Sequence, residues 1–132
     1  MPDELEEPHY PQNFGEWLDS IRRNPFMYFG RKSLSDLTVW RLGYSLARDD
    51  AKLKPSEEEA ELGDEFDAFV SKKYRLPHES RNWQAKIVYM VWTDENAFDE
   101  FFRLLDEFRE GKRKAREREA KRAAQAGKAS GC

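Results

Sequence analysis

The chain of 132 residues is long enough for one domain built around a single hydrophobic core. Its longest apolar run, Ile87 to Trp92, is far too short to cross a membrane, so no membrane partner is expected. The single cysteine, Cys132, cannot form a disulfide within the chain, and the acidic N-terminus does not resemble a signal peptide. We therefore expect a soluble cytoplasmic protein.

The net charge of −3 conceals an uneven distribution along the chain. Residues 1–110 contain 15 Lys and Arg against 24 Asp and Glu, a balance of −9. Residues 111–132 contain 8 Lys and Arg against 2 Glu, a balance of +6. The sequence therefore predicts an acidic body with a basic tail.

Residues 1–12 carry three prolines among acidic side chains and are expected to form a disordered lead-in. A first helix is predicted to begin at Asn13, whose side chain can cap it together with Glu16. It should end at Asn24, because the residue before a proline avoids the α region. An apolar turn over residues 26–29 is expected to follow, and the chain should break at Gly30.

Ser33 or Ser35 is predicted to cap the second helix, and Ser33 with Asp36 three residues later resembles a capping box. The apolar band of this helix is so wide that we expect it to be nearly buried. Its members are Leu34 or Leu37, Val39, Trp40, Leu42, Tyr44, Leu46 and Ala47. Gly43 costs about 1 kcal/mol relative to alanine in a helix, which predicts that another helix crosses closely there.

Ser56 is predicted to cap a third helical segment, with Glu57–Glu59 in its first turn. Carboxylates suit the positive end of the helix dipole, which explains the glutamates better than a metal or acid–base cluster does. Gly63 is expected to split the segment into a short turn and a helix from Asp64, which ends near Leu76 and Pro77.

Residues 80–94 fit either a buried strand or a buried helix, since their apolar run has no clear period. The Ser80 cap and the helical neighbours favour a helix.

The last core helix has the clearest pattern, with phenylalanine and leucine at helical spacing over residues 98–108. Its part in the core is expected to end at Gly111, and the tail beyond it either continues as a solvated helix or is disordered.

Together these segments predict an all-α fold, a single compact domain of about five helices over residues 13–110. A basic C-terminal helical or disordered tail over residues 111–132 completes the chain.

Few residues suit catalysis. A nucleophile must lie beside a base, but Cys132 is the last residue and no serine lies in a G-x-S-x-G turn. The two histidines, His9 and His78, have no clustered acids or cysteines, so no metal site is predicted, and His78 is expected in a surface loop. Phosphate-binding glycine motifs are absent, and no cofactor is expected. An enzyme of unknown class stays open, because an apolar cleft with a few carboxylates has no sequence signature.

Candidate binding residues flank the corner between the first two long helices: Arg22, Arg23, Tyr28, Arg31 and Lys32. Their cations can bind an anion together with free N–H groups at the start of the second helix. Alternatively, they neutralise the helix dipole and pair with acids of the body, which we favour.

The basic tail supplies a second set of candidates, Lys112, Arg113, Lys114 and Arg116, followed by Arg118, Lys121 and Arg122. These side chains either contact phosphates, with a salt-dependent affinity, or only solvate the tail.

Three motifs resemble those of a group of small bacterial proteins. The first is R-x-x-P-x-M-Y-x-G-x-x-S-L, matched from Arg22 to Leu34; the second is S-x-x-W at Ser80 and Trp83; the third is FFRLLDEF over residues 101–108. The group is similar in size and acidity to immunity proteins of bacterial toxin systems, and the resemblance implies a helical fold without a catalytic motif. The first motif also resembles a string of gyrase B-type ATPases, but the magnesium-binding and glycine-rich motifs of that family are missing.

We therefore expect a non-catalytic protein-binding module, in the form of a cytosolic immunity protein that neutralises a toxin by direct binding. Complementary charge would steer an acidic body towards a basic toxin. The alternative is a nucleic-acid-associated protein that uses the basic tail.

Overall fold

The computed structural model describes residues 10–77 and 82–130, which form seven helices and, over these ranges, no strand. The helices are α1 (Phe14–Arg23), α2 (Pro25–Phe29), α3 (Leu34–Asp50), α4 (Glu57–Glu61), α5 (Asp64–Tyr74), α6 (Trp83–Val91) and α7 (Asp94–Ser130). The prediction of an all-α single domain is confirmed. Helices α2 and α4 have five residues each, and the other five helices have nine or more.

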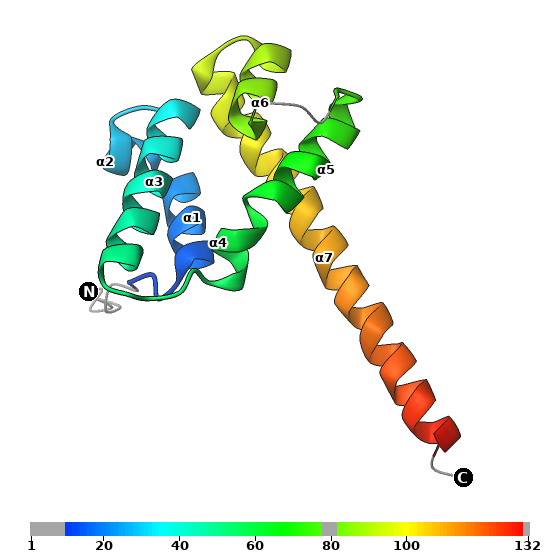
Figure 1. The fold of residues 1–132 in the computed structure, drawn as a ribbon. Helices are drawn as coiled ribbons and strands as arrows, with labels where there is room; N and C mark the ends of the chain where they lie inside the picture. Colours follow the sequence, from blue (N-terminus) through cyan, green and yellow to red (C-terminus); the bar gives the residue numbers. More distant parts are fainter. Residues whose placement is uncertain (1–9, 78–81, 131–132) are drawn as a thin grey trace, which may run out of the picture.

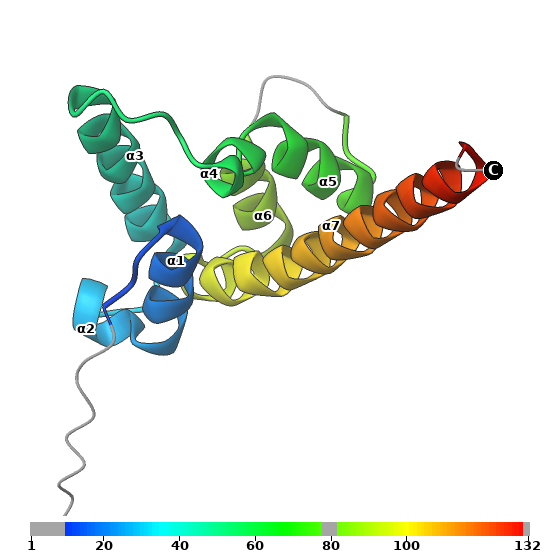
Figure 2. The same ribbon diagram turned by 90° about the horizontal axis from the view of Figure 1, so that it is seen from below.

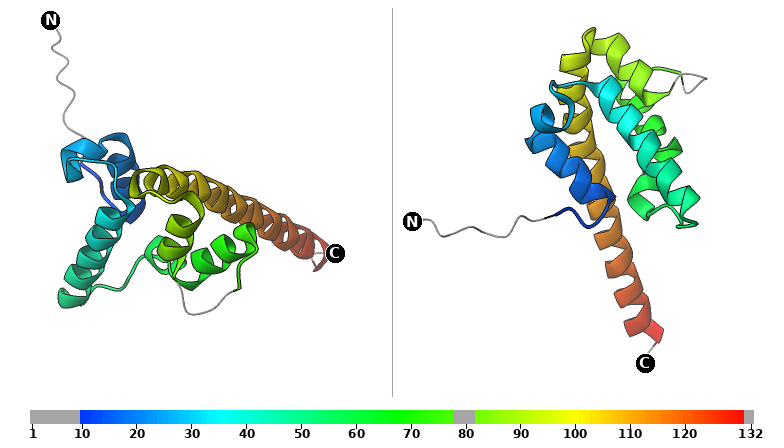
Figure 3. Two further views of the ribbon diagram at one scale, coloured as in Figure 1. Left: turned by 90° about the horizontal axis from the view of Figure 1, so that it is seen from above. Right: turned by 90° about the vertical axis from the view of Figure 1, so that its left-hand side faces the viewer.

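Helix α7 is the axis of the molecule. The other helices gather around its N-terminal half, and its C-terminal half extends beyond them (Figures 1 and 3). Helix α3 lies at the edge of the molecule and is joined to α4 by an extended connection (Figure 2). The acidic body and the basic segment are therefore the two ends of one elongated shape.

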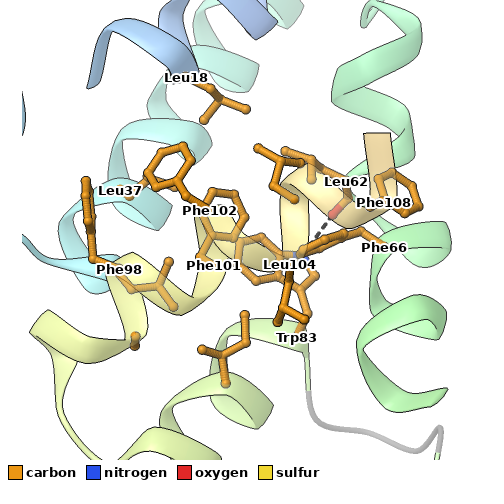
Figure 4. Packing of buried hydrophobic residues seen from close by; sticks show 14 of the residues in the cluster. Leu18, Leu37, Leu62, Phe66, Trp83, Phe98, Phe101, Phe102, Leu104 and Phe108 are labelled. Carbon is orange, nitrogen blue, oxygen red and sulfur yellow. Dashed lines mark hydrogen bonds between the residues drawn. The ribbon is translucent and has the colours of Figure 1, made fainter. Parts of the chain in front are cut away.

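The hydrophobic core forms on one side of the N-terminal half of α7. The predicted apolar face of this helix is fully used, since Phe98, Phe101, Phe102, Leu105 and Phe108 are all buried. Phe66 of α5 packs edge-on against Phe101 and Phe108, with ring centroids 5.7 and 5.3 Å apart (Figure 4). Each such side chain contributes about 1.5–3 kcal/mol through burial.

Trp83 of α6 ties two parts of this core together. Its indole N–H donates to the carbonyl oxygen of Leu62 at 2.8 Å, and its ring stacks on Phe101 at 5.1 Å. The Leu62 carbonyl lies between α4 and α5, where it accepts a second hydrogen bond from Arg41 of α3 at 3.2 Å. A buried tryptophan needs such a partner for its N–H group.

Three predicted helix starts are confirmed. The Asn13 side chain accepts from the Glu16 backbone N–H at 2.9 Å, and Ser33 accepts from the Asp36 N–H at 3.0 Å. Ser56 and Glu59 form a complete capping box. The predicted division near Gly63 is also confirmed, because α4 ends at Glu61 and α5 begins at Asp64.

The corner after α1 is more ordered than the predicted turn. Asn24 ends α1 as expected, but residues 25–29 form the short helix α2. Proline suits the first position of a helix, and Gly30 closes α2 with a left-handed φ of 73°. Phe26 and Met27 are exposed, whereas Tyr28 packs against the core.

The expectation that α3 is nearly buried was wrong. Its apolar band divides into two faces, and only the inward face, which includes Leu34 and Leu37, contacts the core. The outward residues Val39 and Leu42 are exposed, and no atom lies within 4 Å of a Cβ built on Gly43. The predicted helix crossing at Gly43 is therefore absent among the described residues.

Residues 83–91 form helix α6, so the preference for a helix over a strand is confirmed. Its cap is Asn82, which accepts from the Ala85 N–H at 2.9 Å. The expected cap, Ser80, lies outside the described residues. So do His9, His78, Cys132 and most of the lead-in over residues 1–12.

The part of α7 that lies in the core ends near Gly111 as predicted, since Phe108 is the last buried residue among those described, and the helix continues to Ser130. A glycine costs a helix about 1 kcal/mol, but the ion pair between Glu110 and Arg113 bridges this position. Arg113 binds both Glu110 and Glu117 at 2.6 Å. Of the two alternatives for the tail, the solvated helix is the one observed.

Candidate functional site

The most unusual surface of the described chain is the outward side of α3. Val39, Leu42, Gly43 and Leu46 lie on this side, and we call them the α3 outer face. The three large side chains are 69%, 60% and 59% exposed. Single exposed apolar residues are normal, but a row along one helix face commonly marks an interaction site.

Contacts on the opposite side of α3 fix this orientation. Trp40 stacks on Phe14 of α1 with ring centroids 5.7 Å apart, and Tyr44 lies 5.4 Å from the same ring. Near the C-terminus of α3, Arg48 approaches the buried carboxylate of Glu59 at 3.2 Å. Because these contacts hold the inward side, the outer face cannot rotate into the core.

A shallow groove of about 290 Å³ borders the outer face. Val39 and Leu42 line it from α3, and Trp83 and Gln84 line it from the start of α6. Thr38, Arg41 and Asn82 complete its lining, so the groove adds polar groups beside the apolar outer face.

A second apolar cluster surrounds the turn between α6 and α7. Tyr89, Met90 and Trp92 are exposed there, and Trp92 is 85% exposed with a left-handed φ of 75°. A bulky residue in this conformation is strained. The cluster is a second place at which a partner can bind.

A cleft of about 380 Å³ lies between α1, α4 and α7, but its charged groups pair with one another. Arg109 binds Asp19 and Glu58, both at 2.8 Å, and Arg116 lies 3.4 Å from Glu61. Burial raises the pKa of Glu61. These ion pairs fasten α7 to α1 and α4, which explains the cleft structurally.

The candidate cations of the opening corner are mostly occupied within the chain. Arg22 forms a bidentate pair with Asp106 at 2.7 and 2.8 Å, and its hydrogen bond lowers the pKa of that carboxyl. Arg31 pairs with Asp36 at 3.0 Å, and Lys32 with Asp99 at 3.2 Å. The structural interpretation therefore accounts for these three residues.

The remaining two candidates of this corner differ from each other. The Tyr28 hydroxyl lies 2.8 Å from the Ser20 hydroxyl, and its ring packs edge-on against Trp17. Arg23 is exposed and has no ion pair with any described residue. The structure does not gather the five candidates into one pocket.

The start of α3 is also occupied. The Asp94 carboxylate accepts hydrogen bonds from the Ser35 N–H at 2.9 Å, from the Ser35 hydroxyl at 3.0 Å and from the Ser33 hydroxyl. Binding of an external anion by free N–H groups at this position was the less favoured alternative, and a carboxylate of the chain itself occupies the position.

Lys86 and Tyr74 are also satisfied within the chain, whereas the buried Nε of Arg48 has no hydrogen-bond partner among the described residues. Lys86 is only 4% exposed and donates to both Asp67 oxygens at 2.9 and 3.1 Å and to Ser71 at 2.7 Å. Tyr74 donates to Glu100 at 2.5 Å, and burial together with this hydrogen bond raises the pKa of the phenol. Both arrangements join neighbouring helices.

The tail cations fall into two groups. Lys112 and Arg116 face the body, where Lys112 pairs with Glu65 and Arg116 with Glu61. Arg113 pairs within α7. Lys114, Arg118, Lys121 and Arg122 form no ion pair within the described part of the chain.

No group of three or more histidine, cysteine or acidic side chains suited to a metal ion occurs among residues 10–77 and 82–130. None of the helices in these ranges is both long and apolar enough to span a bilayer.

Comparisons with protein-family models, with curated proteins and with solved structures gave no match for this chain. The resemblance to small bacterial proteins therefore stays a prediction.

Sequence reasoning missed the α3 outer face. The signal was present as two sets of apolar residues on different sides of one helix, but a helix of that kind also fits a buried position. Only the position of α3 at the edge of the molecule distinguishes the two.

Proposed function

We propose that the chain is a cytosolic, non-catalytic protein-binding module whose docking surface is the α3 outer face. The observation that carries the proposal is the exposure of Val39, Leu42 and Leu46 in the middle of a well-anchored helix. Burial against a partner gains about 25 cal/mol for each Å² of apolar surface.

Gly43 supports the same surface. It lies between the exposed side chains, no atom lies within 4 Å of its would-be Cβ, and its backbone is helical. The fold therefore has no use for a glycine here. For a partner, the missing side chain would let its backbone approach α3 closely.

The charge of the body indicates the kind of partner. Residues 1–110 carry a balance of −9, so a basic protein with an apolar surface would be attracted and steered towards it. Together with the resemblance to immunity-like bacterial proteins, this charge favours a basic toxin, which the chain neutralises by binding.

The test is purification of the tagged chain from the organism that encodes it, as the wild type and as the variants Leu42→Glu, Leu53→Glu and Trp92→Glu. We expect the wild type to retain one stoichiometric basic protein and Leu42→Glu to lose it, because the variant buries an unpaired carboxylate at the interface. Leu53→Glu, which changes another exposed leucine outside α3, is the matched control and should retain the partner.

Three results would refute the proposal. The first is no stoichiometric partner, and the second is equal retention of the partner by Leu42→Glu and Leu53→Glu. The third is loss of the partner by Trp92→Glu while Leu42→Glu retains it. The last result would place the interface at the α6–α7 turn. The toxin assignment has its own readout, since coexpression with the partner should restore growth for the wild type and Leu53→Glu but not for Leu42→Glu.

A further inference from the structure

We infer that the C-terminal half of α7 is a nucleic-acid-binding rod that contacts the phosphate backbone through one face. Lys114, Arg118, Lys121 and Arg122 form this face, which we call the α7 cationic face. They occupy positions i, i+4, i+7 and i+8, so they share one side of the helix. The inference is independent of the α3 outer face.

Ion pairs with the body determine which cations of α7 remain available to bind phosphate. Lys112 and Arg116 lie about half a turn around α7 from Lys114, and the acids of α4 and α5 neutralise them. Arg113 pairs with both Glu110 and Glu117, the acids that flank Lys114 along α7, and Glu119 forms no ion pair with a cation of this face among the described residues. The free positive charge is therefore on the side of α7 that faces away from the body.

Distance from the acidic body reduces repulsion at the outer two cations of this face, Lys121 and Arg122. Among the described residues, Arg116 forms the last ion pair between α7 and the body, and Arg122 lies about 9 Å further along the helix at 1.5 Å per residue. That separation equals about one Debye length at physiological ionic strength, so repulsion by the body is largely screened there. Figure 1 shows this half of α7 extending away from the other helices.

The side opposite the cations favours nucleic acid over a membrane. A helix that lies in a membrane surface needs large apolar side chains such as Trp, Phe or Leu. Beyond Phe108, the only apolar side chains of α7 are alanines. Phosphate contacts require cations alone, and a rigid helix holds them in register along a backbone groove.

The test is binding of the full chain to short fluorescent DNA and RNA duplexes over a range of KCl concentrations. Four phosphate contacts predict a slope of log K against log salt of about −3 to −4. The double variant Arg118→Gln/Lys121→Gln should weaken binding at least about tenfold at low salt and reduce the slope by about 2. Binding to either duplex supports the inference, and the tighter one identifies the natural ligand.

The matched control is Lys112→Gln/Arg116→Gln, which removes the same charge from the opposite side of α7. It should change the affinity less than about threefold. Circular dichroism should show equal helicity for both variants, because glutamine is a good helix former. Equal weakening by the two variants, no binding at about 50 mM KCl, or tighter binding to anionic vesicles or an acidic polypeptide would overturn the inference.

Discussion

At the residue scale, Gly43 is proposed to serve partner binding at a cost in stability. Gly43→Ala should raise the free energy of unfolding by about 0.5–1 kcal/mol, because alanine favours the helix and nothing crowds the new methyl group. Urea denaturation of the isolated chain measures this change. A destabilised variant would show that another part of the chain does cross α3 at this point.

Local residue roles were predictable where the interaction is local. Asn13, Ser33 and Ser56 each bond a backbone N–H three residues away, so their side chains alone identify the caps. By contrast, the role of Asp94 could not be predicted from the sequence. Its partner Ser35 is 59 residues distant, and no sequence pattern connects them.

At the element scale, Asp94 links the start of α7 to the start of α3 by hydrogen bonds. Burial opposes ionisation of this carboxyl, but the hydrogen bonds from Ser33 and Ser35 outweigh it and lower its pKa. A lowered folded-state pKa means that the stabilisation is complete above the unfolded pKa of about 4 and is lost as the pH falls through the folded value.

Asp94→Asn should therefore lower the free energy of unfolding by about 1–2 kcal/mol at neutral pH, with allowance for partial exposure. The difference from wild type should shrink as the pH falls below about 4. Glu95→Gln, at the neighbouring position of α7, is the control and should have little effect. Denaturation curves at several pH values test the expectation, and a pH-independent difference would contradict it.

Elements were predictable in kind but not always in position. The phenylalanine spacing of α7 identified its core face because five buried residues repeat at one period. The same reasoning placed α3 in the core, since a wide apolar band looks alike whether both sides or one side are covered. The tail after Gly111 stayed open between a helix and disorder, because the cost of a glycine is local while the Arg113–Glu110 ion pair that offsets it spans the position.

At the scale of the whole molecule, the uneven charge of the sequence becomes a spatial division. The acidic body surrounds the first half of α7, and the basic half extends from it (Figure 1). Lys112 and Arg116 mark the boundary, where cations of α7 meet acids of α4 and α5. The α3 outer face and the α7 cationic face therefore lie on separate parts of the molecule.

The most direct test of the α3 docking surface is the affinity of the purified chain for its protein partner, measured by calorimetry with Gly43→Leu. The account predicts that this variant is at least as stable as the wild type, because its site on α3 is open. It also predicts a loss of affinity of about tenfold or more, equivalent to about 1.4 kcal/mol, because the new side chain blocks close approach of the partner. An unchanged affinity in a stably folded Gly43→Leu variant would contradict the account.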